Sequence, residues 1–218
     1  MDKKIKTILI VLIVIIILMF FMQLAYKTVR TGNNITKSAD DLIEYILNIS
    51  SYEAKLEITI NSNKTTNKYV LEQYYMHPSY SKQIVKVPSN LENLEVIYNG
   101  KNLEIKNTNL GLSKIYENYN YLNNNLLWLN SFLSNCRQNY RVEENKDEII
   151  LIADIERFNY KGKLYINKKN NNPTKLEIID NNNDSKIYIE YKEIKLNSIQ
   201  ENNIFAYEFR SIKEKYNF

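Results

Sequence analysis

Two residue types that often carry chemistry occur once each in this 218-residue chain, as His77 and Cys136. A Ser-His-Asp site would have to use His77, and the sequence names no acid partner for it. Pro78 biases His77 toward an extended or turn conformation, so we expect a surface turn there. A dedicated zinc site needs more than one His and one Cys. The sequence therefore predicts neither catalytic residues nor a metal site.

Other ligand-binding motifs are incomplete. Asp180, Asn182 and Asp184 have the spacing that begins a calcium loop, but Ser185 occupies the glycine position of that motif. Tyr191 stands where a bidentate glutamate belongs, so we interpret the segment as a β-turn. With four glycines in the chain, there is little room for a glycine-rich phosphate loop. We expect no cofactor and no enzymatic activity.

Aromatic residues are the more informative group, because the chain contains 18 tyrosines. Tyrosine combines a large apolar ring with a polar tip, which suits interfaces and ligand-lined grooves. Tyrosine is also simply a favourable strand residue, and the sequence leaves both interpretations open. The candidate partner or ligand contacts are Tyr74, Tyr75, Tyr116, Tyr119, Trp128 and Phe132.

An apolar run near the N-terminus indicates a membrane anchor. Ile8 to Met22 contains no polar residue, and residues 8–26 approach the roughly 20 residues needed to cross a bilayer. Lys3, Lys4 and Lys6 precede the run and favour a cytoplasmic N-terminus. The run ends without a small-x-small cleavage pair and without a lipidation Cys, which favours an uncleaved anchor over a cleaved signal peptide.

The rest of the chain is expected to form one extracytoplasmic domain. We divide the sequence into a cytoplasmic tail (1–7), a transmembrane anchor (8–26), a linker (27–37) and the domain (38–218). The net charge is +4, and the Lys and Arg residues form no dense cluster along the sequence. We therefore expect no nucleic-acid partner. A single Cys allows no internal disulfide, so the domain must be stabilised by its core.

Hydrophobic periodicity predicts a helix, a series of strands, a second helix and a second series of strands. Helical spacing covers residues 38–50, where Ser38 and Asp41 form a capping-box pattern, and it returns from Leu122 to Cys136 after possible caps at 123–125. Alternation predicts strands near 52–60, 67–76, 80–87, 94–98, 101–106, 139–143, 148–155, 160–167, 174–180, 185–194 and 204–209. This order favours an α+β fold in which one antiparallel sheet curls into an incomplete barrel and helices cover one face.

Several segments resemble LolA-like proteins. Residues 71–88 and the hairpin at 97–105 are similar to the strands of LolA-like lipoprotein carriers. Residues 112–119, 125–129 and 131–132 are similar to the spore germination lipoprotein GerS and its relatives. The resemblance implies a LolA-like half-barrel with helices packed on its concave face. It also implies a non-enzymatic protein whose partner is the spore-cortex N-acetylmuramoyl-L-alanine amidase, although the lipidation Cys of GerS is absent here.

Two functions follow as expectations. The first is a membrane-anchored binding protein of the GerS type that supports a cell-wall amidase in sporulation or germination. It would act outside the cytoplasmic membrane, for example between forespore and mother cell. The second is a carrier or sensor of a lipid or other apolar ligand, which needs a roomy apolar cavity between sheet and helices. A packed half-barrel with contacts on its outside would favour the first.

Overall fold

The computed structural model describes residues 38–199, except for 63, 79, 120–124 and 181–184. The expected anchor at 8–26, the linker at 27–37 and the expected strand at 204–209 lie outside these residues. Within the described part of the chain, no helix is long and apolar enough to cross a membrane.

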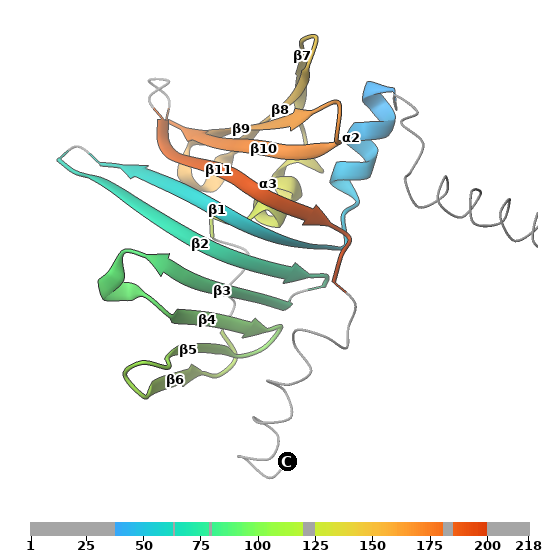
Figure 1. The fold of residues 1–218 in the computed structure, drawn as a ribbon. Helices are drawn as coiled ribbons and strands as arrows, with labels where there is room; N and C mark the ends of the chain where they lie inside the picture. Colours follow the sequence, from blue (N-terminus) through green and yellow to red (C-terminus); the bar gives the residue numbers. More distant parts are fainter. Residues whose placement is uncertain (1–37, 63, 79, 120–124, 181–184, 200–218) are drawn as a thin grey trace, which may run out of the picture. The chain divides into compact units, whose positions relative to one another are not determined.

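The described residues form one antiparallel sheet with two α-helices (Figure 1). The helices are α2 (Ala39–Leu47) and α3 (Leu129–Cys136). The first strands are β1 (Ser51–Asn61), β2 (Thr66–Met76), β3 (Tyr80–Val87), β4 (Leu94–Asn99), β5 (Leu103–Asn107) and β6 (Leu112–Tyr116). The later strands are β7 (Arg141–Glu144), β8 (Glu148–Ile155), β9 (Tyr160–Asn167), β10 (Asn172–Ile179) and β11 (Ser185–Leu196).

The strand order is β6-β5-β4-β3-β2-β1-β11-β10-β9-β8-β7. Each neighbouring pair is antiparallel. All sequential strands are neighbours except β6 and β7, which lie at the two edges, and β1 pairs with β11 in the middle of the sheet. Between the two halves the chain crosses from β6 to β7 through α3 (Figure 1). The predicted antiparallel half-barrel is thereby confirmed for the described residues.

One face of the sheet supplies the core. Along β1, the inward positions Tyr52, Leu56 and Ile58 are buried, while the intervening Lys55 and Glu57 are exposed. This alternation follows from the two-residue period of a strand. The inward rows of β8, β9, β10 and β11 join the same cluster, together with the buried faces of α2 and α3. The core therefore lies between the sheet and the two helices.

The first helix begins as its sequence indicates. Asp41 donates its backbone N–H to Ser38 Oγ at 3.2 Å, and the Ser38 N–H reaches Asp41 Oδ2 at 3.2 Å, which completes a capping box. Leu42 and Ile46 are buried. At the other end, the Arg137 guanidinium donates to the Leu47 carbonyl at 2.6 and 3.2 Å, so the residue that follows α3 holds the last turn of α2.

The second helix is shorter than its apolar spacing predicts. It begins at Leu129, with Trp128 at the N-cap and no side-chain capping bond. Asn125 does not cap the helix: its side chain accepts from the Leu127 N–H at 3.0 Å, and its carbonyl accepts from the Trp128 N–H at 3.3 Å. This local turn competes with helix formation, so the expected start at Leu122 is wrong for the described residues from 125 on.

Asparagine carries much of the turn chemistry. Among the described residues, five asparagines have a left-handed backbone conformation with φ between 53° and 61°: Asn93, Asn118, Asn159, Asn171 and Asn197. Asparagine tolerates this region better than other side chains. The Asn99-Gly100 pair lies between β4 and β5, in the hairpin that the sequence indicated at 97–105. Strand β6, in contrast, was not predicted.

Candidate protein-binding surface

The concave face of the half-barrel is filled by α3 and the residues before it. The Trp128 and Leu129 side chains are fully buried, and Leu133 and Phe132 are nearly so. Phe132 lies against Gly162 of β9, where an added Cβ would stand 2.3 Å from Phe132 Cε2. Since real Cβ contacts are never this short, Phe132 occupies the space that any other residue at 162 would need.

The cavity beneath α3 is small. It has a volume of about 50 Å³, and its lining includes Leu126, Phe132, Ile155 and Ile178. Pockets for small molecules typically measure about 300–1,000 Å³, so this space is too small for an acyl chain. Larger hollows, including one of about 470 Å³ beside α2, are open and lined largely by polar and charged residues.

A buried polar network holds the segment before α3 on the sheet. The Gln73 side chain donates to Gln83 Oε1 at 3.0 Å and to the Leu127 carbonyl at 3.2 Å. Tyr52 Oη donates to Gln73 Oε1 at 3.4 Å, and Gln73 is fully buried. Sequence analysis missed this network. The sequence signal for this network is the polar Gln73, which occupies an inward position of the strand between Leu71 and Tyr75.

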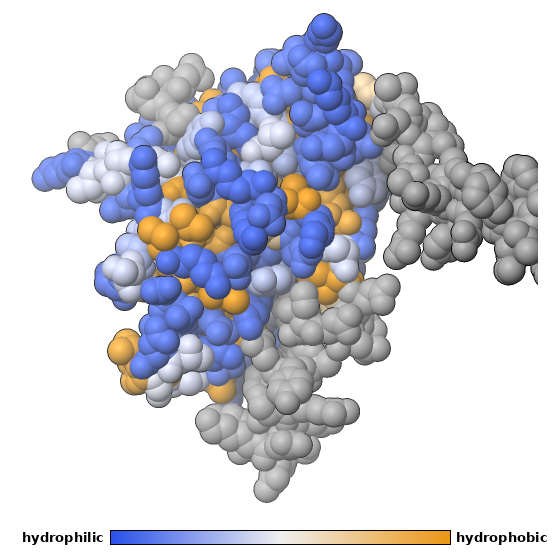
Figure 2. Space-filling model, in the orientation of Figure 1, coloured by the Kyte–Doolittle hydropathy of each residue, from blue (hydrophilic) through white to orange (hydrophobic). Residues whose placement is uncertain are grey.

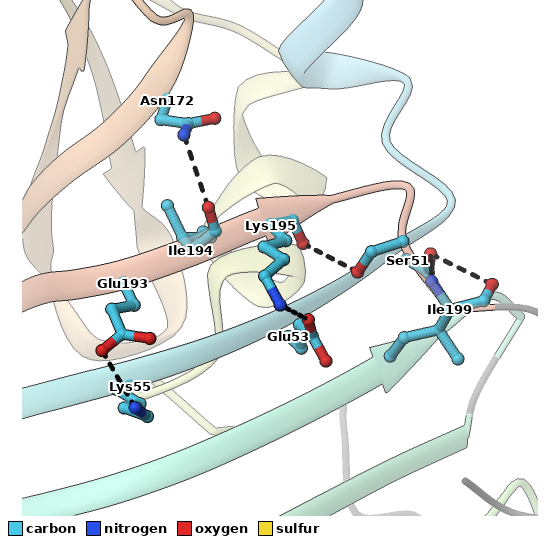
Figure 3. A network of polar contacts seen from close by, with 9 residues as sticks. Ser51, Glu53, Lys55, Asn172, Glu193, Ile194, Lys195 and Ile199 are labelled. Carbon is cyan, nitrogen blue, oxygen red and sulfur yellow. Dashed lines mark hydrogen bonds and ion pairs between the residues drawn. The ribbon is translucent and has the colours of Figure 1, made fainter. Parts of the chain in front are cut away.

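The outer face of the sheet is covered by cross-strand ion pairs. Lys55 pairs with Glu193 at 2.9 Å, and Lys195 pairs with Glu53 at 2.6 Å, both between β1 and β11 (Figure 3). The bonds with these glutamates raise the pKa of both lysines. In the same orientation as Figure 1, this face is mainly hydrophilic, with apolar patches over the central strands (Figure 2).

Tyr74 lies on this outer face, in a shallow hollow of about 190 Å³ lined by Glu53, Lys55, Glu72 and neighbouring residues of β11. Partial burial raises the pKa of its phenol, and the negative charges of Glu72 and Glu53 raise it further. A hydrogen bond with the Glu72 side chain also raises this pKa, so Tyr74 stays neutral with its hydroxyl engaged by Glu72. The hollow itself is shallow and rich in paired charges, which suits a solvated surface.

The β6 end of the sheet has a different character. Leu110 and Leu112, at the β5–β6 turn, are 66% and 62% exposed, and an apolar spot marks this hairpin tip at the lower left of Figure 2. Tyr116 and Tyr119 form a tilted ring pair with centroids 6.0 Å apart. Lys114 Nζ lies 4.9 Å from the Tyr116 ring centroid. Exposed apolar and aromatic groups are therefore concentrated at one edge of the sheet.

The residues whose types could carry chemistry lie in separate parts of the fold. His77 is exposed in the turn between β2 and β3. Cys136 is fully buried, and burial raises the pKa of its thiol to about 12. Asp180 pairs with Lys186 at 3.2 Å, while 181–184 of the calcium-like segment lie outside the described residues. Among the described residues, no cluster of three or more His, Cys, Asp or Glu side chains could hold a metal ion.

The structure places the six candidate contacts in three environments. Tyr74 lies on the outer face, and Tyr116 and Tyr119 lie at the β6 edge. The other three belong to the core: Tyr75 contacts the Tyr52 ring at a centroid distance of 5.6 Å, and Trp128 and Phe132 fill the concave face. Buried side chains are not accessible to a protein partner, so only Tyr74, Tyr116 and Tyr119 remain candidate partner contacts.

Comparison with known proteins identifies a family. The family described as "Sporulation protein YdcC-like" matches residues 5–205. A search of curated proteins finds no significant match.

Several solved structures are similar to this chain. An uncharacterized conserved protein from Thermus thermophilus is 12% identical, with a TM-score of 0.50, covering 76% of this chain and 91% of that chain. A chain of the Clostridioides difficile CwlD amidase–GerS lipoprotein complex is 25% identical, with a TM-score of 0.45 and coverages of 71% and 91%. A LolA-superfamily protein from Nitrosomonas europaea is 15% identical, with a TM-score of 0.40 and coverages of 74% and 94%.

Proposed function

Because this chain belongs to the YdcC-like family of sporulation proteins, we propose that it is a non-enzymatic binding protein that docks on a cell-wall amidase and supports its activity. In this proposal, residues 8–26 hold it in the cytoplasmic membrane with the half-barrel outside. The amidase would be the enzyme that modifies the spore cortex.

The packed concave face is the observation that carries the binding role. Trp128, Leu129 and Phe132 fill the space in which a LolA-like carrier would hold an apolar ligand, and the cavity that remains measures about 50 Å³. The cavity that the described residues leave beneath α3 is too small for such a ligand, which favours binding through the outer surface. Exposed Leu110, Leu112 and Tyr119 supply apolar contact area there.

The amidase is proposed from the sequence. Residues 112–119, 125–129 and 131–132 are similar to GerS-type lipoproteins, whose partner is a cortex amidase. The family match adds a link to sporulation. In this proposal the anchor replaces the lipid of GerS, confines the domain to the membrane surface and so raises its effective concentration near a co-localised enzyme.

The non-enzymatic role is proposed from the chemistry of the side chains. His77 is an exposed turn residue, and the Cys136 thiol is protonated at physiological pH because its pKa is raised to about 12. A nucleophile needs a base within hydrogen-bond reach, whereas the thiol of Cys136 is buried on α3 and the single histidine, His77, is exposed in the β2–β3 turn. The chain would support the amidase by binding the active state of the amidase more tightly than its inactive state.

A pull-down of the full chain from detergent-solubilised sporulating cells, read by mass spectrometry, tests the proposal. We expect a cell-wall amidase to be recovered with the wild-type protein and to be reduced at least fivefold with Tyr119→Ala. Tyr140→Ala is the matched control, because Tyr140 is a similarly exposed tyrosine at the other end of the sheet (39% against 46%). Recovery of a stoichiometric lipid without any amidase would contradict the proposal.

A further inference from the structure

The β6 edge combines a free strand with exposed apolar side chains. β6 is the last strand of the sheet and pairs along one side only, with β5, from Leu103↔Tyr116 to Asn107↔Leu112. Among the described residues, no strand pairs with its other side. The backbone groups of such an edge can form a ladder with an added strand.

The opposite edge of the sheet shows how this protein protects a strand. β7 has four residues, three of which are charged, and Glu144 forms an ion pair with Lys168 at 2.6 Å. Short, charged edges resist pairing with other chains. β6 carries a single charge, on Lys114, and its first residue Leu112 is 62% exposed. The two edges of one sheet therefore differ in their suitability for a partner strand.

The side chains of β6 indicate what the partner strand contains. Leu112, Lys114 and Tyr116 alternate along the strand and share one face of the sheet. Within the described residues, Lys114 forms no ion pair, and its ammonium lies over the Tyr116 ring. A strand paired opposite these residues would gain from a carboxylate facing Lys114 and from apolar residues facing Leu112 and Tyr116.

A second copy of this chain does not meet these requirements. If two β6 strands paired antiparallel over all five residues, the midpoint of Leu112–Tyr116 would be Lys114. Lys114 would then face Lys114 of the other copy, and like charges directly opposite each other are destabilising. A heterologous partner avoids this repulsion.

We propose that β6 is a docking edge that binds an extended segment of the partner protein, in which a carboxylate lies between two apolar residues at alternate positions. This proposal rests on the protein-binding role proposed above and names the surface that performs it. The partner strand adds to the sheet beside β6, and Tyr119 and Leu110 contact the residues at its ends.

Two synthetic peptides test the edge without the amidase. Both are fluorescein-labelled and blocked at their ends, with a Thr-Val-Thr-Glu-Thr-Val-Thr core in one and Lys in place of Glu in the other. By fluorescence anisotropy with the full chain in detergent, we expect the Glu peptide to bind about tenfold more tightly than the Lys peptide. Lys114→Glu should reverse this order, and Lys101→Glu, on an exposed turn lysine, should leave it unchanged.

The outcomes separate the docking edge from the proposed function. A reversed preference in Lys114→Glu supports the edge even if no amidase is recovered in the pull-down. If an amidase is recovered equally with the wild type, Lys114→Glu and Leu112→Lys, the edge proposal is wrong while the binding role stands. The edge proposal is also overturned if neither peptide binds the wild type, or if Lys114→Glu still prefers the Glu peptide.

Discussion

Burial controls the chemistry of the side chains that usually react. Cys136 lies on the buried face of α3, where burial raises the pKa of its thiol to about 12. Tyr75 and Tyr191 are also buried, and burial raises the pKa of both phenols. All three groups therefore keep their protons in the folded protein over a pH range in which they lose them in the unfolded chain.

This difference predicts that stability falls at alkaline pH. The thiol of an unfolded chain titrates near pH 8.5, so between about pH 9 and 12 the folded state binds more protons than the unfolded state. The free energy of unfolding then decreases with pH, by up to about 1.4 kcal/mol per pH unit for one group. Urea unfolding at pH 8, 9 and 10 measures the slope, and Cys136→Ala should flatten it in this interval. An equal slope in both proteins would contradict the assignment to Cys136.

For single residues, the sequence indicated which side chains face inward but not which contacts those side chains make. The alternation that puts Tyr74 and Tyr75 on opposite faces of β2 is a property of any strand. The role of Gln73 could not be predicted, because its partners Gln83 and the Leu127 carbonyl come from other parts of the chain. Residue types alone also did not separate the buried Trp128 from the exposed Tyr119.

At the scale of elements, the contact between α3 and β9 depends on one missing side chain. Gly162→Ala would place a Cβ within 2.3 Å of the Phe132 ring, so either the ring or the strand must move. We expect a loss of about 1–3 kcal/mol in the free energy of unfolding, typical of overpacked cores. Urea denaturation at neutral pH measures this loss.

A double variant tests whether the loss comes from this contact. Phe132→Leu removes the ring atoms that an added Cβ would meet, so the loss in Gly162→Ala/Phe132→Leu should be smaller than the sum of the two single losses. Additive losses would show that Gly162 is required for another reason.

Most element boundaries were predictable because most strands have a buried face and each described helix has an apolar stripe. The capping box at Ser38 gave a local signal that the structure confirms. β6 was missed because an edge strand with Leu112 exposed shows no inward apolar row. The start of α3 was misplaced because a local turn at Asn125 competes with the helix, and because the bond from Gln73 to the Leu127 carbonyl joins distant parts of the chain.

At the scale of the whole molecule, the first and last of the described strands meet in the centre of the sheet. β1 pairs with β11 from Tyr52↔Leu196 to Ile60↔Ile187. Local periodicity predicts strands but not this closure, because the pairing joins residues more than a hundred positions apart. The closure places α2 and α3 on the same core and leaves the β6 and β7 edges at opposite ends. The β7 edge is charged, and the β6 edge presents apolar side chains.

The most direct test of this account is an amidase assay on purified spore-cortex peptidoglycan. Three reactions are compared: the full chain alone, a cell-wall amidase from the same sporulating cells alone, and both together. We predict that the chain alone cleaves nothing and that the mixture releases product several-fold faster than the amidase alone. Cleavage by the chain itself, or an amidase rate that the chain leaves unchanged, would contradict the account of a non-enzymatic supporting protein.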